Sequence, residues 1–410
     1  MEQQYKVYSY RWVVLGIYMY VAALTQLYWL NFAAIDTYIE DLLKIPASDV
    51  QWFTMIFPLV QVILTIPAGI IIDKIGFKWG VGIGTIFTGL FALLRAVSPA
   101  SFVMLLIAQA GISIGQPFIM NGVTKLATVW FSPKEEATAV GLGSLALFVG
   151  MMVALGLTPL LVQNMGFSPM LWIYGIAGLI GMLAFVFLIK PHPLTPSRAP
   201  EQDQSEVKWG GMGVILKNRN FLLLGFVALV GIGVFNGLAT WLEKILHEMH
   251  NIALTDVGNV SAALIFSGLI GCFVIPLISD KIGRRKPFLL LASLVGAICI
   301  TALIFIQGYT GNMINGIVLG FFLLSALPIM YTMSAEMTGP KYAGVSIGYL
   351  QLVGNGAGVI LVPTVEGLNS ATGQFVVPLV LLVVLMLISF IIALWIRDTH
   401  PGVAQDRSQG

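Results

Sequence analysis

The sequence has 410 residues, of which 58% are hydrophobic and only 10% are charged. A water-soluble domain normally has about a quarter of its residues charged, so this composition and a mean hydropathy of +0.91 exclude an ordinary soluble protein. The net charge of +2 gives no argument for a nucleic-acid partner, and the two cysteines, Cys272 and Cys299, stand in apolar runs. We expect an all-α integral membrane protein with no disulfide framework, no metal and no cofactor.

Apolar runs predict twelve membrane-spanning helices, because a helix needs about 20 apolar residues to cross the hydrocarbon core. The predicted spans are 11–36, 49–72, 79–98, 100–131, 136–163, 166–190, 219–246, 255–279, 287–308, 312–337, 341–366 and 372–397. The N-terminal residues lead directly into the first span, so no cleavable signal is expected. The predicted parts are a six-helix bundle, a linker, a second six-helix bundle and a tail, over residues 1–190, 191–218, 219–397 and 398–410.

The positions of Lys and Arg predict the orientation, since positively charged loops stay in the cytoplasm. With both termini in the cytoplasm, the basic residues lie on the cytoplasmic side except for Lys44, Arg95 and Lys244, which fall outside, and Lys125, which lies within the fourth span. The segment 190–219 is rich in Pro, Ser and charge and is predicted to be a solvated tether. We therefore expect a multi-pass, monomeric protein of the cytoplasmic membrane, whose partners are the lipid bilayer and a small-molecule substrate.

A charged sequence, Asp-Lys-Ile-Gly followed by a basic residue, comes after the second span of each predicted half. Asp73 and Asp280 begin the two copies and lie about half the chain apart. A stop-transfer signal would explain the lysines, but it would not explain a matching aspartate and glycine. The repeat predicts two structurally equivalent halves, related by an axis along the membrane normal.

The repeated loop resembles the signature of the major facilitator superfamily, Gly-x-x-x-Asp-Arg/Lys-x-Gly-Arg-Arg/Lys. In the first copy the matching residues are Gly69, Asp73, Lys74, Gly76 and Lys78. In the second copy they are Asp280, Lys281, Gly283, Arg284 and Arg285. The copies depart from the signature at Phe77 and Pro276. The resemblance implies the twelve-helix fold of that family and transport by alternating access.

The resemblance also implies that these loops are gates. In this family the aspartate of one half faces the start of a helix in the other half, where unpaired amides and the helix dipole favour negative charge. Asp73 would face the start of the eleventh span and Asp280 the start of the fifth. Lys74 or Lys78 would pair with Glu336 at the end of the tenth span. Such contacts would hold the cytoplasmic side shut and break when it opens.

A second resemblance concerns residues 115–139, which are similar to the corresponding region of the feline leukaemia virus subgroup C receptor-type transporters. The shared core is Trp130-Phe131-x-Pro133-Lys134-Glu135. Those transporters handle choline, ethanolamine and haem, and the lack of their long terminal extensions suggests a prokaryotic relative. Their ligand site is an aromatic cage, which Tyr28 and Trp29 match in kind, whereas Asn236 stands at a tyrosine position. The resemblance therefore implies the place of the pocket but leaves choline specificity open.

Polar and aromatic side chains near the middle of the lining spans are the candidates for substrate binding, because such groups need partners inside a bilayer. These candidates are Gln26, Tyr28, Trp29, Asn31, Gln116, Asn121, Asn236, Tyr331, Gln351 and Asn355. The alternative role for each is a hydrogen bond between helices, which contributes about 0.6–2 kcal/mol in membranes.

No Asp or Glu is predicted at the middle of a span, and the candidate pocket is rich in aromatic groups. This favours a neutral or zwitterionic solute, or a quaternary ammonium bound by cation–π attraction worth about 2 kcal/mol. The leading interpretation is a secondary transporter. The alternatives are a non-cycling receptor or sensor, and a proton-coupled exporter of metabolites or haem, for which Glu243 would be a candidate if its helix lies deeper than predicted. No nucleophile-and-base constellation or phosphate loop is found, so no enzyme is expected.

Overall fold

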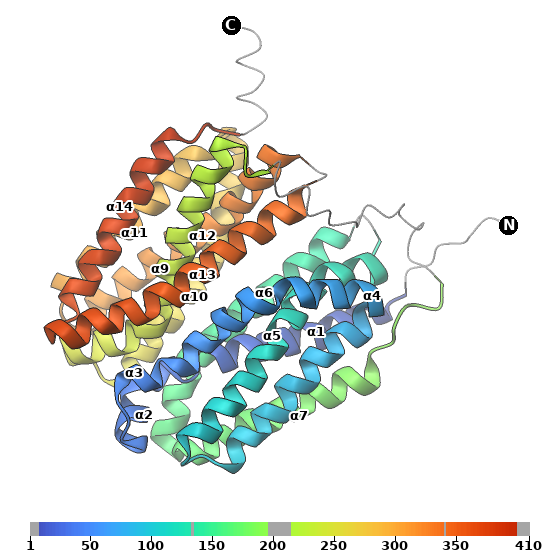
Figure 1. Cartoon of the computed structure of the whole chain (residues 1–410), viewed down its shortest axis with the longest axis horizontal. Helices are drawn as coiled ribbons and strands as arrows, with labels where there is room; N and C mark the ends of the chain where they lie inside the picture. Colours follow the sequence, from blue (N-terminus) through green and yellow to red (C-terminus); the bar gives the residue numbers. More distant parts are fainter. Residues whose placement is uncertain (1–7, 133–134, 196–214, 340–341, 400–410) are drawn as a thin grey trace, which may run out of the picture. The chain divides into compact units, whose positions relative to one another are not determined.

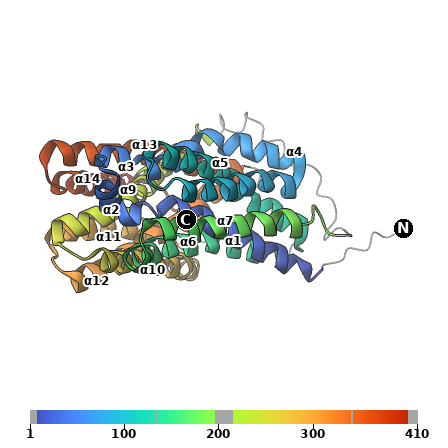
Figure 2. The ribbon, with the colours of Figure 1, turned by 90° about the horizontal axis from the view of Figure 1, so that it is seen from below.

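The computed structural model describes residues 8–132, 135–195, 215–339 and 342–399. The chain divides into two compact units, Met1–Gln202 and Asp203–Gly410. Each unit is a bundle of long helices that run side by side (Figure 1, Figure 2). The point of division lies within the predicted linker 191–218, most of which is outside the described residues, as is most of the predicted tail 398–410.

Within the described residues, the first unit is built from five long helices and three short elements. The long helices are α1 (Tyr10–Leu30), α4 (Trp52–Val97), α5 (Phe102–Trp130), α6 (Glu136–Met165) and α7 (Phe167–Leu188). The short elements between α1 and α4 are η1 (Ala33–Ile35), α2 (Asp36–Leu43) and α3 (Ala47–Val50). The 46-residue α4 breaks at Gly76, where φ is 83° and ψ is 170°, so it supplies two spans.

The described part of the second unit has six long helices. They are α9 (Arg219–His250), α10 (Leu254–Ile282), α11 (Lys286–Phe305), α12 (Tyr309–Thr338), α13 (Ala343–Thr372) and α14 (Val376–Trp395). Within the described residues, eleven helices are long and apolar enough to cross a membrane. Because α4 contains two of the spans, the prediction of twelve is confirmed.

Two predicted boundaries each differ from the structure by six residues. The first span was expected to continue to residue 36, but α1 ends at Leu30 and the chain turns through η1 into α2. The eleventh span was expected to stop at Glu366, where charge returns to the sequence. Instead α13 continues to Thr372, because Glu366 is buried within the bundle and the helix ends at Gly373, whose φ is 68°.

The helices of the two units pack in the same pairs. In the first unit α1 packs on α6, and α4 packs on both α5 and α7. In the second unit α9 packs on α13, α10 on α12, and α11 on α14. Prolines lie inside corresponding helices of each unit, at Pro67 and Pro276, Pro117 and Pro328, and Pro159 and Pro363. The prediction of two pseudo-symmetric six-helix bundles is therefore confirmed.

Small residues bring the central helices of each unit into close contact. A side chain on Gly115 of α5 would lie 2.4 Å from the carbonyl oxygen of Gly84 on α4. In the second unit, a side chain on Gly320 of α12 would lie 2.0 Å from the carbonyl oxygen of Leu264 on α10. Close backbone approach of this kind holds helices together where lipid removes the hydrophobic driving force.

Candidate functional site

Two of the predicted substrate residues lie in a buried polar cluster around Arg95. The Arg95 side chain has no exposed surface, although the sequence placed this residue at the outer end of the predicted span 79–98. Its Nη1 donates hydrogen bonds to Gln109 Oε1 at 2.9 Å and to Asn31 Oδ1 at 3.3 Å. The guanidinium carbon lies 5.1 Å from the ring centre of Tyr28 and 4.8 Å from that of Phe32. Aromatic faces and amide oxygens thus surround this cation.

Gln109 ties the cluster to three helices. Its Nε2 donates to the carbonyl oxygen of Tyr28 at 2.8 Å and to that of Phe53 at 3.0 Å. The Tyr28 hydroxyl donates to the carbonyl oxygen of Tyr174 on α7 at 2.7 Å. Among the described residues no carboxylate pairs with Arg95, and its Nε and Nη2 have no hydrogen-bond partner. The cluster is a structural junction that keeps unused donor capacity.

The other candidates of the first unit are also buried or partly buried. Trp29 is 6% exposed and its Nε1 donates to the carbonyl oxygen of Thr54 at 3.2 Å. Gln26 and Gln116 are buried, and the only described contact of the Gln26 amide is a weak one, 3.8 Å from Nε2 to Met120 Sδ. Asn121 Nδ2 donates to the carbonyl oxygen of Thr65 at 2.7 Å.

In the second unit, the candidates lie on α9, α12 and α13. Asn236 of α9 is buried against Gly358 of α13, and its Nδ2 has no hydrogen-bond partner among the described residues. Tyr331 of α12 interacts with the Gln351 side chain of α13. Asn355 Nδ2 donates to the carbonyl oxygen of Gln351 at 2.9 Å. The structure thus groups Tyr331, Gln351 and Asn355, and it places Asn236 beside the next turn of α13.

The charged loop of the first unit is a simple turn. Gly76 takes a backbone conformation that is essentially restricted to glycine. The exposed Asp73 accepts from Lys125 Nζ at 3.3 Å, with no other described partner. Lys78 Nζ lies 5.4 Å from the ring centre of Trp79. Lys74 is exposed beside Asp73, and a side chain on Gly69 would lie 3.8 Å from Asn121 Nδ2.

The charged loop of the second unit is centred on Arg285, whose side chain is only 9% exposed. Its Nη1 donates to Asp280, and its Nη2 donates to Glu336 Oε1 at 3.2 Å. Gly283 ends α10 in the left-handed region, with φ 71° and ψ 29°. Lys281 and Arg284 are exposed. Asp398 accepts the backbone N–H groups of Arg285 and Lys286 at 3.0–3.1 Å, so it caps the start of α11.

An ion pair that the sequence did not suggest lies at the start of α6. Arg11 Nη2 donates to Glu135 Oε1 at 2.8 Å, and Ser132 Oγ donates to Glu135 Oε2 at 3.1 Å. The hydrogen bond from Arg11 holds the pKa of Glu135 below its ordinary value. Pro133 and Lys134, which belong to the motif 130–135, lie outside the described residues.

Acidic side chains near the ends of three helices are more buried than the sequence suggested. Asp36, Glu243 and Glu366 are 3%, 3% and 5% exposed. Glu366 Oε1 accepts from Ser370 Oγ at 2.8 Å, while its buried Oε2 has no hydrogen-bond partner among the described residues. No group of three or more His, Cys, Asp or Glu residues that could hold a metal ion occurs in the described part of the chain.

Comparison with known proteins identifies the family. The family model described as Major Facilitator Superfamily matches residues 16–310 and 249–410. The chain belongs to the Major Facilitator Superfamily. Members of this superfamily are membrane transporters rather than enzymes. A bacterial homologue of the human lysosomal transporter Spinster, solved in an inward-facing and unoccupied conformation, has the same fold, with a TM-score of 0.77 and 16% identity over 95% of this chain and 97% of that one.

Individual relatives span several organisms. An uncharacterized MFS-type transporter of Caenorhabditis elegans is 28% identical over 363 residues, which are 84% of this chain and 62% of that protein. The human choline/ethanolamine transporter FLVCR2 is 22% identical over 374 residues, covering 87% of this chain and 71% of the relative. An uncharacterized protein of Archaeoglobus fulgidus is 32% identical over 231 residues, 56% of this chain and all of that protein. The resemblance to the receptor-type transporters is thereby confirmed.

Within this superfamily member, the sequence did not point to Arg95 or to the Arg285 centre. Arg95 follows an apolar run just before a loop, a position that is equally typical of a cation at the membrane surface. The sequence feature that could have indicated a buried polar partner is Gln109, a polar residue inside the fourth predicted span with no polar partner nearby in the sequence. Arg285 was predicted as a gate residue, but its pairing with Glu336 depends on a contact between α11 and α12.

Proposed function

We propose that this protein is a secondary transporter that moves a small neutral, zwitterionic or quaternary ammonium solute across the cytoplasmic membrane by alternating access. Two bundles with the same helix pairing, each with a charged loop between its second and third spans, carry the proposal. A static receptor has no need for two such loops. We place both termini in the cytoplasm and treat the protein as a monomer.

The chemistry of the candidate pocket supports the solute class. The candidates are aromatic residues and amides, with Trp29 one residue before the end of α1 in the first unit, and Asn236 of α9 and Tyr331 of α12 in the second. A cation without hydrogen-bond donors is stabilised by aromatic faces, and an amide serves a hydroxyl or carboxylate group. Relatives that are 22–24% identical are named choline/ethanolamine transporters, which agrees with this class.

Purified protein in proteoliposomes tests the proposal. We expect one of choline, ethanolamine, amino acids, nucleosides or haem to raise the thermal unfolding midpoint and to enter the vesicles. Trp29→Ala should lower the affinity for that solute at least tenfold, about 1.4 kcal/mol, and Asn236→Ala should cause a loss of similar kind. Well-folded protein that binds a solute but moves none, in any gradient, would instead identify a receptor.

The Trp29 test needs controls, because its indole N–H also bonds to the carbonyl oxygen of Thr54. Trp29→Phe removes that hydrogen bond but keeps an aromatic face, so we expect it to retain affinity within about threefold. Trp241 is a matched control: it is fully buried and its Nε1 donates to the carbonyl oxygen of Val362 at 3.0 Å. Trp241→Phe should lower stability without changing affinity. Equal affinity of Trp29→Ala and the unaltered protein would reject Trp29 as a pocket residue.

The proton-coupled alternative is favoured by one observation, the buried Glu366 Oε2 that lacks a hydrogen-bond partner. Such an oxygen is a site where a proton can be bound and released during a transport cycle. Under this alternative, Glu366→Gln abolishes solute movement driven by an imposed pH gradient while solute exchange without a gradient continues. Glu366→Gln with unchanged pH-driven transport would remove this alternative at Glu366.

A further inference from the structure

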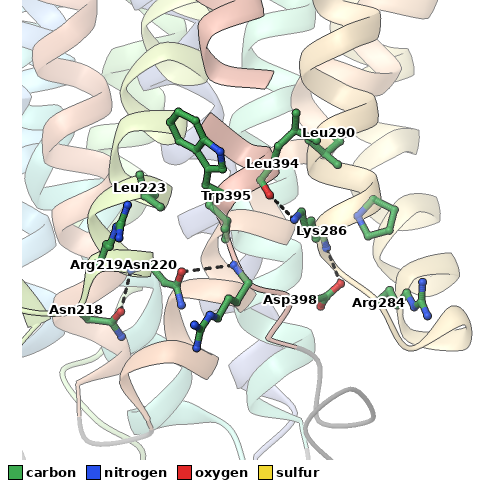
Figure 3. A pocket seen from close by; sticks show the side chains of 13 residues that line it. Asn218, Arg219, Asn220, Leu223, Arg284, Lys286, Leu290, Leu394, Trp395 and Asp398 are labelled. Carbon is green, nitrogen blue, oxygen red and sulfur yellow. Dashed lines mark hydrogen bonds between the residues drawn. The ribbon is translucent and has the colours of Figure 1, made fainter. Parts of the chain in front are cut away.

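A cleft of about 1150 Å³ opens at one end of the second unit, where α9 and α11 begin and α14 ends (Figure 3). All three chain segments reach the same end of the bundle, because α9 and α11 begin there and α14 returns to it. The start of α9, which follows the predicted linker 191–218 in the sequence, lies at this end. The cleft is separate from the substrate candidates, which lie farther along α9, α12 and α13.

The lining of the cleft is strongly basic. Four cations line it, Arg219, Arg284, Lys286 and Arg397, against one carboxylate, Asp398, so the lining has a net charge of +3. Both oxygens of Asp398 accept backbone N–H groups at the start of α11, and Lys286 Nζ donates to the carbonyl oxygen of Leu394. The three arginines are exposed, and none of them forms an ion pair among the described residues. Within the described residues, the cleft therefore gathers positive charge that no ion pair neutralises.

Apolar side chains complete the same cleft. Trp395 and Leu394, in the lining, are 64% and 46% exposed, and Leu223 and Leu290 also line the cleft. The exposed apolar surface continues along α14 through Ile391, which is 49% exposed. Tryptophan beside cations, at the point where an apolar helix surface ends, is typical of the headgroup level of a membrane. A free phosphate ion would use only the basic part of this lining.

The corresponding place in the first unit is closed. The Tyr10 hydroxyl at the start of α1 donates to the carbonyl oxygen of Leu188 at the end of α7, and Lys190 Nζ lies 5.5 Å from the Tyr10 ring centre. In the second unit the start of α9 and the end of α14 pack through apolar side chains, and the hydrogen bond described between them runs from the Arg397 N–H to Asn220 Oδ1 at 3.4 Å. We propose that the cleft binds the phosphate headgroup of an anionic phospholipid, with Arg219, Arg284 and Arg397 around the phosphate and acyl chains along Leu290, Leu394 and Trp395.

The test uses the purified full-length protein in detergent, titrated with phosphatidylglycerol, phosphatidylcholine or inorganic phosphate, with the thermal unfolding midpoint as readout. Phosphatidylglycerol should raise the midpoint more than phosphatidylcholine, and added salt should weaken its effect. Arg284→Gln and Arg397→Gln should each weaken phosphatidylglycerol binding about fivefold, since a basic residue near an anionic surface contributes about 1 kcal/mol. Lys190→Gln, which removes an exposed cation from the closed place in the first unit, is the matched control and should change nothing.

The titrations and variants distinguish a phospholipid headgroup from a free phosphate ion as the bound anion. Trp395→Ala should weaken the effect of phosphatidylglycerol, because its site includes the apolar wall. Equal effects of phosphatidylglycerol and phosphatidylcholine on the unaltered protein would overturn the proposal, and this comparison needs no variant to fold. So would an effect of inorganic phosphate equal to that of phosphatidylglycerol and lost in Arg284→Gln, because the ligand would then be a free anion. Unchanged lipid binding in both arginine variants would also overturn it.

Discussion

Among the described residues, Asp73 of the charged loop in the first unit contacts one cation, Lys125, whereas in the second unit Arg285 contacts both Asp280 and Glu336. The equivalent of Arg285 in the first loop is Lys78, which lies over Trp79 instead. The equivalent of the exposed Arg284 is Phe77, which is buried and packs on Phe185. Both copies of the repeat therefore keep the turn and its aspartate. The contacts around the turn differ: in the first unit Phe77 packs on an apolar side chain, and in the second unit Arg285 forms ion pairs.

The largest difference is expected on removing the equivalent cations. Arg285→Gln leaves two carboxylates without their shared partner, and we expect the free energy of unfolding to fall by about 3 kcal/mol. Lys78→Gln removes a cation with no described carboxylate partner, so its loss should stay within about 0.5 kcal/mol. Chemical unfolding in detergent measures both. Equal losses would show that the two loops are stabilised in the same way.

The glycines of the loops should differ in what they tolerate. Gly76 has φ 83° and ψ 170°, a region restricted to glycine, whereas Gly283 has φ 71° and ψ 29°, where asparagine is also found. We expect Gly76→Asn to cost about 2 kcal/mol of stability and Gly283→Asn less than about 1 kcal/mol. A side chain on Gly76 would meet no atom within 4 Å, so its cost is conformational rather than steric. The reverse order in unfolding midpoints would contradict this assignment.

The aspartates test the gating role. Under the proposed function, Asp73→Asn should increase the inward-open population about fivefold, since attraction of a carboxylate to a helix start contributes about 1 kcal/mol. Asp280→Asn should act in the same direction but more weakly, because Asp280 already shares Arg285 with Glu336. Distances between spin labels on the linker-side ends of the two units measure the populations. An unchanged distribution in Asp73→Asn would remove this residue from the gate.

The smallest effect is expected at the Arg11–Glu135 pair, for which the second unit has no described counterpart. Because the pKa of Glu135 is lowered in the folded protein, its stabilising contribution is complete above the ordinary carboxyl pKa, about 4.3, and is lost as the pH falls through the lower folded value. Glu135→Gln should therefore reduce the unfolding midpoint at neutral pH and flatten its decline below about pH 4. Arg11→Gln should have the same pH profile. A decline identical to that of the unaltered protein would exclude this pair.

The features that were predicted from the sequence are those that depend on local patterns. Apolar runs located the twelve spans, and the repeat around Asp73 and Asp280 located the two equivalent halves. Contacts between distant segments were not predictable in this way. Asp398, which follows α14 in the sequence, caps the start of α11. The helix α13 continues past Glu366 because this side chain is buried in the bundle. The first contact joins residues 112 positions apart in the sequence, and the second depends on how the helices of the bundle pack. The roles of the ten substrate candidates stay predictions.

The buried Arg95 has a consequence for how the first unit is made. A desolvated arginine is costly inside a membrane unless it has hydrogen-bond partners. Arg95 donates to Asn31, which directly follows α1 and is synthesised earlier, and to Gln109 of α5, which is synthesised later. The span that ends at Val97 therefore reaches its stable position only when α5 enters the bilayer beside it. During biogenesis these two spans should insert together as a helical hairpin, and a nascent chain arrested before Gln109 should leave the third span poorly anchored.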